Sequence, residues 1–351
     1  MSRTKVNYEE TETTYGMHFL REPLDCEDHG VTVVDAEPGW EGPEHEHEGN
    51  DHEEVYFLVE GEATITVDGE DVSMNAGDAV RVSPGATRQL TNGDTRSQFV
   101  ITGASQGIGR SIAETLAAGG ADVAICSRAQ ERIDPVADAI EEECEGSALA
   151  VECNVRDRES VERFIERTIE EFGDIDCLVN NAGGEFVAPF EDISPNGWNA
   201  VMDLNVTGTV HCTQVVGETM RQSGGGRIVN LSSVNGQHAA PGESHYGAAK
   251  AAIIRLTETL AVEWAGEGIR VNCVAPGLIQ TPGVAETLGI ESEAMPPREQ
   301  VDRRIGYGED VADVVQFLCS PAASFMTGET LTVKGVPRPG NSMEHDLGLE
   351  R

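Results

Sequence analysis

A tyrosine and a lysine stand four residues apart in the segment Tyr246-Gly-Ala-Ala-Lys250, and this lysine is one of only three in a chain of 351 residues. Four residues is about one helical turn, so both side chains would project from the same face of a helix. An ammonium group beside a phenol lowers the phenol pKa from about 10, which makes the tyrosine a candidate proton donor and acceptor. Ser233, thirteen residues upstream, and Asn205 add polar groups that can orient a substrate oxygen or a water.

A glycine-rich segment, Thr102-Gly-Ala-Ser-Gln-Gly-Ile-Gly109, follows a strand-like run directly and opens a helical pattern. Glycines at such a junction allow a tight turn and a close approach of the backbone, so that a pyrophosphate can lie at the helix N-terminus. An ordinary loop is the alternative, because a glycine motif alone is weak evidence. The predicted cofactor-binding residues in this loop are Gly103, Ser105, Gln106, Gly107, Ile108 and Gly109.

The second strand-like run ends in Cys126-Ser127-Arg128. An acidic residue here would bind the adenosine ribose hydroxyls, whereas a serine followed by an arginine leaves room and charge for a 2′-phosphate. We therefore expect NADP(H) to be favoured, with NAD(H) possible. The alternative is that Arg128 is a solvated surface side chain.

The elements that must position these residues fall into two patterns, which meet near residue 97. Short alternating runs at 55–59, 63–67 and 79–82, separated by turn signals, predict a small antiparallel β-barrel or jelly roll. From residue 98, strand-like runs at 99–102, 122–127, 149–153, 177–180, 227–231 and 270–274 alternate with helical patterns. This alternation predicts an α/β fold, a doubly wound Rossmann-type parallel sheet with helices on both faces. We expect a barrel domain in residues 1–96 and an α/β domain in residues 97–351.

Six motifs follow one another along the chain: the glycine loop, Asn180-Asn-Ala-Gly183, Asn205, Ser233, the Tyr246–Lys250 pair and Ala275-Pro-Gly-Leu-Ile-Gln-Thr281. In this order they resemble the short-chain dehydrogenase/reductase family over about residues 97–340. The resemblance is specific, because separated motifs must fall at compatible spacings. It implies interconversion of a carbonyl and a secondary alcohol, with 3-oxoacyl thioesters as one candidate class of substrate. The catalytic residues would be Asn205, Ser233, Tyr246 and Lys250, with Tyr246 exchanging the proton, Ser233 orienting the substrate oxygen, Lys250 holding the nicotinamide ribose and Asn205 positioning a water.

The same resemblance assigns further cofactor contacts. Asn154 stands where the family often has an aspartate at the adenine, and Gln106 stands where NADP-using members often have a basic residue. The glycine loop, Ser127 and Arg128 are thus joined by further residues that the resemblance implies to bind the cofactor. They are Asn154, Val155, Asn181, Ala182, Gly183, Tyr246, Lys250, Pro276, Gly277, Ile279 and Thr281. Residues 282–304 would shape the substrate pocket through Leu288, Ile290 and Met295, which are equally compatible with helix packing, and residues 237–241 would line it too.

The first domain resembles the cupin family, in which three histidines and a glutamate hold a metal inside a barrel. The segment from Gly39 through His45, His47 and Glu54 resembles the first cupin motif, and residues 77–92 resemble the second. Arg88 occupies the position where the second motif has its histidine, so we expect no bound metal, with His45, His47 and Glu54 as the candidate ligands if one binds. A small-molecule-binding or metal-dependent barrel, with the dinucleotide domain regulatory, is the competing function.

The composition restricts the partners. Asp and Glu number 62 against 24 Lys and Arg, for a net charge of −38 spread along the chain. Such a surface repels nucleic acids and anionic lipids, and it resembles proteins that work in molar salt. The eight cysteines show no C-x-x-C pair, and we expect free thiols. With a polar N-terminus and no apolar run of 18 residues, the chain is expected to be a cytoplasmic enzyme for a small-molecule substrate and to form a homo-oligomer.

Overall fold

The computed structural model describes residues 5–7, 11, 13–14, 17–20, 22–24, 32–34, 40, 42–44, 54–59, 62–75, 77–83, 85–92, 96–144, 146–282, 284 and 296–336. The chain divides into two compact units, Met1–Arg96 and Ser97–Arg351. Within the described residues no helix has both the length and the apolar character needed to cross a membrane.

The first unit is built from antiparallel strands, as in a jelly roll. Its described strands are β1 (Thr13–Thr14), β2 (Met17–Phe19), β3 (Thr32–Val34), β4 (Glu54–Phe57), β5 (Glu62–Val67), β6 (Glu70–Asn75), β7 (Ala79–Val82) and β8 (Arg88–Asn92). They form three sheets with the orders β1-β2-β3, β4-β7 and β6-β5-β8. A small apolar cluster of Ile65, Met74 and Val82 lies between the last two sheets. The alternation predicted for 55–59, 63–67 and 79–82 is therefore found in strands.

The second unit is a parallel sheet of seven strands in the order β11-β10-β9-β12-β13-β14-β15. The strands are β9 (Gln98–Thr102), β10 (Asp122–Ser127), β11 (Ala148–Glu152), β12 (Cys177–Asn180), β13 (Gly226–Leu231), β14 (Ile269–Pro276) and β15 (Thr330–Val333). All six predicted strands are present, and the parallel doubly wound prediction is confirmed. The edge strand β15 was not predicted, because its four residues are short and only partly buried.

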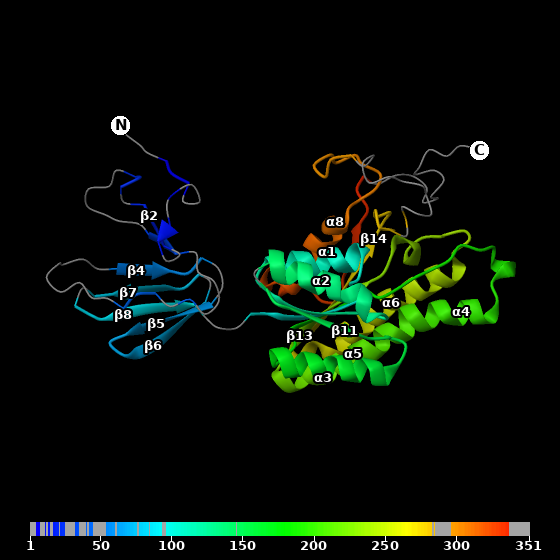
Figure 1. The fold of residues 1–351 in the computed structure, drawn as a ribbon, viewed down its shortest axis with the longest axis horizontal. Coiled ribbons are helices and arrows are strands. Elements are labelled where there is room, and N and C mark those ends of the chain that lie inside the picture. Colours follow the sequence, from blue (N-terminus) through cyan, green and yellow to red (C-terminus); the bar gives the residue numbers. More distant parts are fainter. Residues whose placement is uncertain are drawn as a thin grey trace. The chain divides into compact units, whose positions relative to one another are not determined.

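Helices cover the sheet in two layers (Figure 1). One layer consists of α1 (Gly107–Ala118), α2 (Gln130–Glu143) and α8 (Gly308–Cys319), and its core includes Ile112, Ile133 and Val315. The other consists of α3 (Arg158–Phe172), α5 (Gly208–Ser223) and α6 (Ser244–Trp264), around Phe164 and Val216. The short helix α4 (Pro195–Met202) is capped by Ser194, whose hydroxyl accepts a hydrogen bond from the Gly197 amide. The strands are apolar on both sides because both sheet faces are covered.

Strand β9 joins the second unit, although it follows the barrel strand β8 after only a short connection. It pairs in parallel with β10 and with β12, and Phe99, Val100 and Ile101 are buried in the sheet. A strand that uses both of its edges in one sheet cannot close another. Residues 98–102 are therefore unavailable to the barrel.

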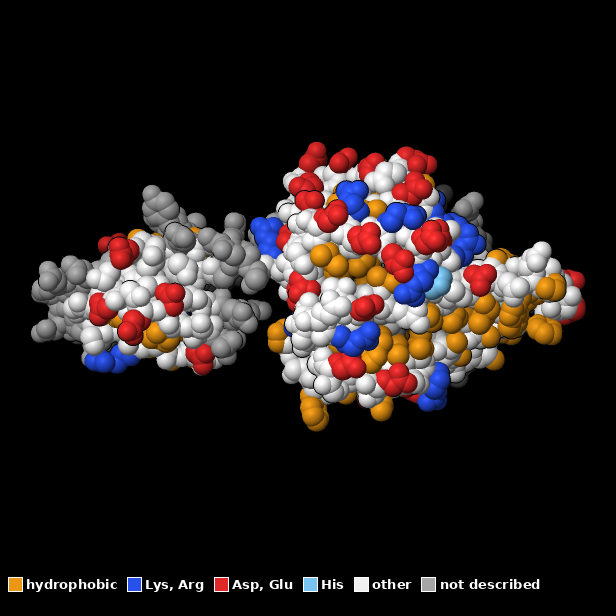
Figure 2. Space-filling model, turned by 90° about the horizontal axis from the view of Figure 1, so that it is seen from below, with side chains coloured by type: hydrophobic (Ala, Val, Ile, Leu, Met, Phe, Trp, Pro, Cys, Tyr) orange, Lys and Arg blue, Asp and Glu red, His pale blue; other side chains and the backbone are white. Residues whose placement is uncertain are grey.

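Acidic side chains are scattered over the surface in Figure 2 and do not form one block. Seven cysteines in the described part of the chain are free, and six of these are buried. The expectation of free thiols holds for these residues, since no disulfide joins them.

Candidate active site

The glycine loop between β9 and α1 has the backbone geometry that only glycine adopts readily. Gly103 and Gly107 have φ values of 68° and 58°. A Cβ atom on Gly103 would lie 2.9 Å from the Cα of Ala182, and one on Gly109 would lie 2.3 Å from the side-chain nitrogen Nδ2 of Asn181. Larger residues would push the loop off the neighbouring strand end, so the glycines hold the α1 N-terminus open for an anion.

Asn181 and Ala182, which follow β12, anchor this loop. The Asn181 Nδ2 donates to the carbonyl oxygens of Thr102 at 2.9 Å and Gly103 at 3.1 Å. The backbone amides of Asn181 and Ala182 donate to the Thr102 hydroxyl at 3.1 and 3.0 Å. The carboxyl ends of β9 and β12 are thereby locked together at the point where the sheet order changes direction, which is where doubly wound sheets bind ligands.

One large cleft, of about 1330 Å³, lies above these strand ends. It is lined by every predicted cofactor residue except Asn154: Gly103, Ser105, Gln106, Gly107, Ile108, Gly109, Ser127, Arg128, Val155, Asn181, Ala182, Gly183, Tyr246, Lys250, Pro276, Gly277, Ile279 and Thr281. Ser233 lines it as well.

The prediction for Asn154 differs from the structure. Its Oδ1 accepts hydrogen bonds from the backbone amide and the Nε of Arg156, both at 3.3 Å. The side chain is thus held by its own turn, and the neighbours Cys153 and Val155 line the cleft in its place. Short polar side chains that bond to the backbone two residues on are common in turns, and this local bond competes with an outward role.

A second arginine lies at the adenosine end of the cleft, and sequence reasoning missed it. Arg132, in the first turn of α2, donates from Nη2 to the Gln106 Oε1 at 2.9 Å and lines the cleft together with Arg128. Ser127 makes a turn with its hydroxyl, which donates to the Ala129 carbonyl at 2.8 Å. Arg132 of α2 therefore places a basic group beside Gln106, at the position where the glycine loop itself has none.

Asn205 lies beneath the cleft in a π-helical turn. The turn Asp203–Thr207 (η3) interrupts the helix between α4 and α5. The fully buried Asn205 donates from Nδ2 to the carbonyl oxygens of Gly184 at 2.8 Å and Val201 at 2.9 Å. π-turns inside helices are frequent at functional sites. A Cβ atom on Gly183 would lie 2.7 Å from the Asn205 Oδ1 and 3.2 Å from the Lys250 Nζ, so Asn205 and Lys250 flank the same glycine.

Tyr246 and Lys250 project from the first two turns of α6, as the spacing predicted. The Lys250 Nζ donates to the Leu231 carbonyl at 2.8 Å and lies 5.5 Å from the centre of the Tyr246 ring. Ser233 follows β13, and its hydroxyl lies close enough to Tyr246 to lower the pKa of the phenol. The three side chains therefore meet at the carboxyl ends of β13 and β12.

The charges at this site differ from the prediction. Burial raises the pKa of Tyr246, the charge of Glu185 raises it further, and the Ser233 hydroxyl opposes the change. Burial also lowers the pKa of Lys250 to about 8. The expected lowering of the phenol pKa by Lys250 is not found, because the ammonium is directed to Leu231 and the low-dielectric surroundings favour the neutral phenol.

The walls of the cleft are basic in an acidic protein. Six basic side chains line it, whereas only two acidic side chains do so: Arg128, Arg132, Lys250, Arg303, Arg304 and Lys334 against Glu185 and Glu243. A concentration of positive charge in a chain of net charge −38 favours an anionic ligand. Of the predicted pocket residues, Ala240 and Pro241 line the cleft, while Leu288, Ile290 and Met295 lie outside the described residues.

In the barrel, Arg88 is fully buried. Its Nε donates to the Glu54 Oε2 at 2.8 Å, and the Tyr56 hydroxyl donates to the same oxygen at 2.8 Å. One candidate metal ligand is thus neutralised by a guanidinium, which would repel a divalent cation. His45 and His47 lie outside the described residues, and no group of three metal-binding side chains occurs among the residues that are described.

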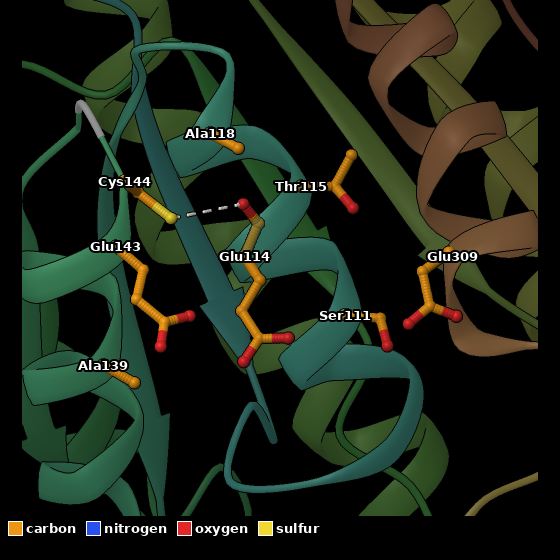
Figure 3. A pocket seen from close by; sticks show the side chains of 8 residues that line it. All are labelled: Ser111, Glu114, Thr115, Ala118, Ala139, Glu143, Cys144 and Glu309. Atoms are coloured by element: carbon orange, nitrogen blue, oxygen red, sulfur yellow. Dashed lines mark hydrogen bonds between the residues drawn. The ribbon is translucent and has the colours of Figure 1, made fainter.

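A second hollow, of about 390 Å³, lies among α1, α2 and α8 and is shown in Figure 3. Glu114, Glu143 and Glu309 line it together with Cys144, whose thiol donates to the Glu114 carbonyl at 3.8 Å. Burial first and then the two nearest glutamates raise the pKa of the Cys144 thiol. The thiol therefore stays protonated and is a poor nucleophile.

Two family models match the chain. One, described as enoyl-(acyl carrier protein) reductase, matches residues 103–335, and the other, described as cupin domain, matches residues 32–102. The cupin match includes β9, which here belongs to the parallel sheet.

Known proteins resemble the second unit. A 3-oxoacyl-[acyl-carrier-protein] reductase of Synechocystis sp. is 40% identical over 246 residues, which cover 69% of this chain and 96% of the relative. A cis-4-hydroxycyclohexanecarboxylate dehydrogenase of Sinomonas cyclohexanicum is 40% identical over 237 residues, covering 67% and 94%. The solved structure of a 7α-hydroxysteroid dehydrogenase with NADH and 7-oxo glycochenodeoxycholic acid superposes with a TM-score of 0.63 at 33% identity, covering 70% of this chain and 96% of the other.

Proposed function

The chain belongs to the short-chain dehydrogenase/reductase family of oxidoreductases, and from this premise we propose that residues 97–351 interconvert a carbonyl group and a secondary alcohol with NADP(H) as the preferred cofactor. The observation that carries the proposal is the meeting of Ser233, Tyr246 and Lys250 in one cleft with the glycine loop. Similar proteins with reductase and dehydrogenase names support the reaction class.

Tyr246 is the proton donor in the direction of reduction. Because burial raises its pKa, the phenol is protonated at neutral pH and ready to donate to the developing alkoxide. Ser233 donates a hydrogen bond to the same substrate oxygen and thereby fixes it beside the phenol. In the reverse direction the tyrosine must first lose its proton, so oxidation should require higher pH than reduction.

Lys250 holds positive charge in a buried place at the wall of the cleft. With a pKa of about 8, its ammonium group is charged at neutral pH. The carbonyl of Leu231 orients it at 2.8 Å, so that it can bind ribose hydroxyls of a cofactor and stabilise negative charge on Tyr246. Asn205, buried next to the same glycine, supports a proton path from Lys250 to solvent through water.

A nicotinamide dinucleotide is compatible with the residues that line the cleft, because the glycines at positions 103, 107 and 109 let the loop pack closely against neighbouring segments at the N-terminus of α1, where phosphate groups bind favourably. When bound, it supplies the hydride. The chain would hold its phosphates at the glycine loop, its adenine near Val155 and its nicotinamide near residues 276–281. Arg128 and Arg132 support a 2′-phosphate and hence NADPH, although NADH is accommodated by the same backbone.

The substrate is a small carbonyl compound or alcohol, and 3-oxoacyl thioesters are one class to test because a relative at 40% identity bears that name. Retention of Tyr246 favours carbonyl over alkene reduction. Phe325, fully exposed, and the exposed Phe317 on α8 offer an apolar surface for a second copy, so we propose a homo-oligomer.

The reaction is tested by measuring NADPH and NADH oxidation with a panel of ketones, 3-oxoacyl thioesters and sugars in molar KCl. Turnover that depends on Tyr246 supports the proposal. Absence of turnover with every carbonyl compound and with every corresponding alcohol would contradict it.

For the barrel, we propose a role other than metal catalysis, because the Arg88–Glu54 ion pair occupies its interior. A carboxylate or sugar acid is a more compatible ligand for the guanidinium than a cation is. Elemental analysis should find less than about one metal per two chains, and chelation should leave reductase activity unchanged. A stoichiometric transition metal that is lost in His47→Ala would reverse this assignment.

A further inference from the structure

Two carboxyl groups lie at the catalytic end of the cleft, and the reaction as derived so far uses neither. Glu185 belongs to the loop after β12, and Glu243 is the residue that precedes α6. The fold holds the two segments together, because the Ala188 amide donates to the Gly242 carbonyl at 2.9 Å. The Phe186 ring also packs edge-on against the buried His245 at a centroid distance of 4.3 Å. The placement of both glutamates is therefore built into the scaffold.

The carboxyl groups of Glu185 and Glu243 lie within reach of each other, so that each affects the proton affinity of the pair. Glu243 is 4% exposed and also accepts a hydrogen bond from the Asn235 side-chain amide. Glu185 is exposed by area, yet the cleft walls crowd its carboxyl group. Partial loss of water and then the charge of Glu243 raise the pKa of Glu185 to about 7, against the opposing charge of Lys250. Near neutral pH the pair therefore shares a proton and offers a ligand both a donor and acceptors.

This carboxyl pair lies close to the reacting atoms. After burial, the charge of Glu185 is the largest cause of the raised pKa of Tyr246, and it also affects Lys250. Glu185, Glu243, Tyr246 and Ser233 all line the same cleft. A substrate whose oxygen meets Tyr246 and Ser233 would therefore lie in the same cleft as the carboxyl pair, within the reach of its charge.

We propose, resting on the function proposed above, that Glu185 and Glu243 select substrates with a hydroxyl group on the carbon next to the reacting one, namely α-hydroxy ketones and vicinal diols. A hydroxyl group can donate to one carboxylate oxygen and accept from the shared proton. An alkyl group in its place would displace water from the pair without replacing its hydrogen bonds, which is costly. Sites that bond a substrate hydroxyl discriminate strongly against analogues that lack it.

The test compares matched substrates that differ by one hydroxyl. Initial rates of the full-length protein are measured with 1,2-cyclohexanediol and cyclohexanol for oxidation, and with 2-hydroxycyclohexanone and cyclohexanone for reduction. Because Glu185 remains open to solvent, we expect a preference in kcat/KM of about 10- to 100-fold for the hydroxylated members, below the limit for a fully enclosed site. Equal kcat/KM within each pair would overturn the inference while leaving the proposed reaction intact. Turnover of none of the four compounds, alongside turnover of other ketones, would also overturn it.

Glu185→Leu and Glu185→Gln test the residue itself. Leucine removes both the donor and the acceptors, so the preference should fall to about 3-fold or less in Glu185→Leu, and Glu191→Leu, at an exposed glutamate in η2 (Phe190–Asp192) outside the cleft, should keep it. The acid limb of the pH profile for alcohol oxidation should also move to lower pH in Glu185→Gln, because a negative neighbour that opposes the ionisation of Tyr246 has been removed. A purely structural role for Glu185 would not move that limb. An unchanged substrate ratio in folded Glu185→Leu would refute the assignment, and the wild-type ratio remains a test if the variant does not fold.

Discussion

Discrimination between the two cofactors should depend on Arg128 and Arg132 together. The two guanidinium groups line the adenosine end of the cleft from different segments, and Gln106 holds Arg132 in place through a 2.9 Å hydrogen bond. Both side chains are exposed to solvent. Replacing either arginine by alanine should weaken NADPH binding and leave NADH binding nearly unchanged, since only NADPH carries the 2′-phosphate.

The magnitude follows from the exposure of the two arginines. A buried charge-assisted hydrogen bond contributes about 1.5 to 3 kcal/mol, whereas an exposed ion pair contributes about 1 kcal/mol or less. We take about 1 kcal/mol for each arginine, which corresponds to about a 5-fold increase in the NADPH Kd for each single variant and about 30-fold for the double variant. In molar KCl the Debye length falls to about 3 Å, so these factors should be smaller there than at about 0.1 M salt.

The assay is fluorescence titration of NADPH and NADH with wild type, Arg128→Ala, Arg132→Ala and the double variant at both salt concentrations. Arg255→Ala is the matched control, because Arg255 is exposed on α6 and pairs with Glu258 away from the cleft. Equal losses of affinity for NADPH and NADH would refute the phosphate-binding role of the two arginines. No loss for either cofactor in the double variant would refute it as well.

Three further results are expected. Tyr246→Phe should lower turnover at least about 10²-fold with little change in the cofactor Kd, and near-normal turnover would remove this residue from the mechanism. The pKa of Lys250 is about 8, so its positive charge is complete well below that pH and is lost as the pH rises through it. Reduction rates should therefore fall above about pH 8. A flat pH profile up to about pH 10 would contradict this role of Lys250. Arg88→Met should destabilise the barrel by about 2 to 3 kcal/mol, less than the 3 to 5 kcal/mol for a fully buried pair, because the Glu54 side chain is 31% exposed. Calorimetry should show this loss in one transition only, with activity of the second unit retained, and an unchanged thermogram would contradict a stabilising role for the pair.

Local patterns in the sequence were enough to predict the parallel sheet, the glycine loop and the shared face of Tyr246 and Lys250. Alternation of strands and helices depends on neighbouring residues, and a spacing of four on a helix sets a common direction whatever surrounds it. The assignment of residues 98–102 to the parallel sheet was predictable for the same reason, since the glycine loop must follow a strand.

Partners and charge states were decided by the tertiary structure. Arg132 meets Gln106 across 26 residues and Arg88 meets Glu54 across 34, and no local pattern specifies either contact. The Asn154 side chain accepts a hydrogen bond from Arg156 and does not line the cleft, because a contact two residues away forms locally. The pKa values of Tyr246, Lys250 and Glu185 depend on how much water and which charges the folded walls leave beside each group. Desolvation and Coulomb energies are set by three-dimensional distances, and these arise only when segments far apart in the chain pack together.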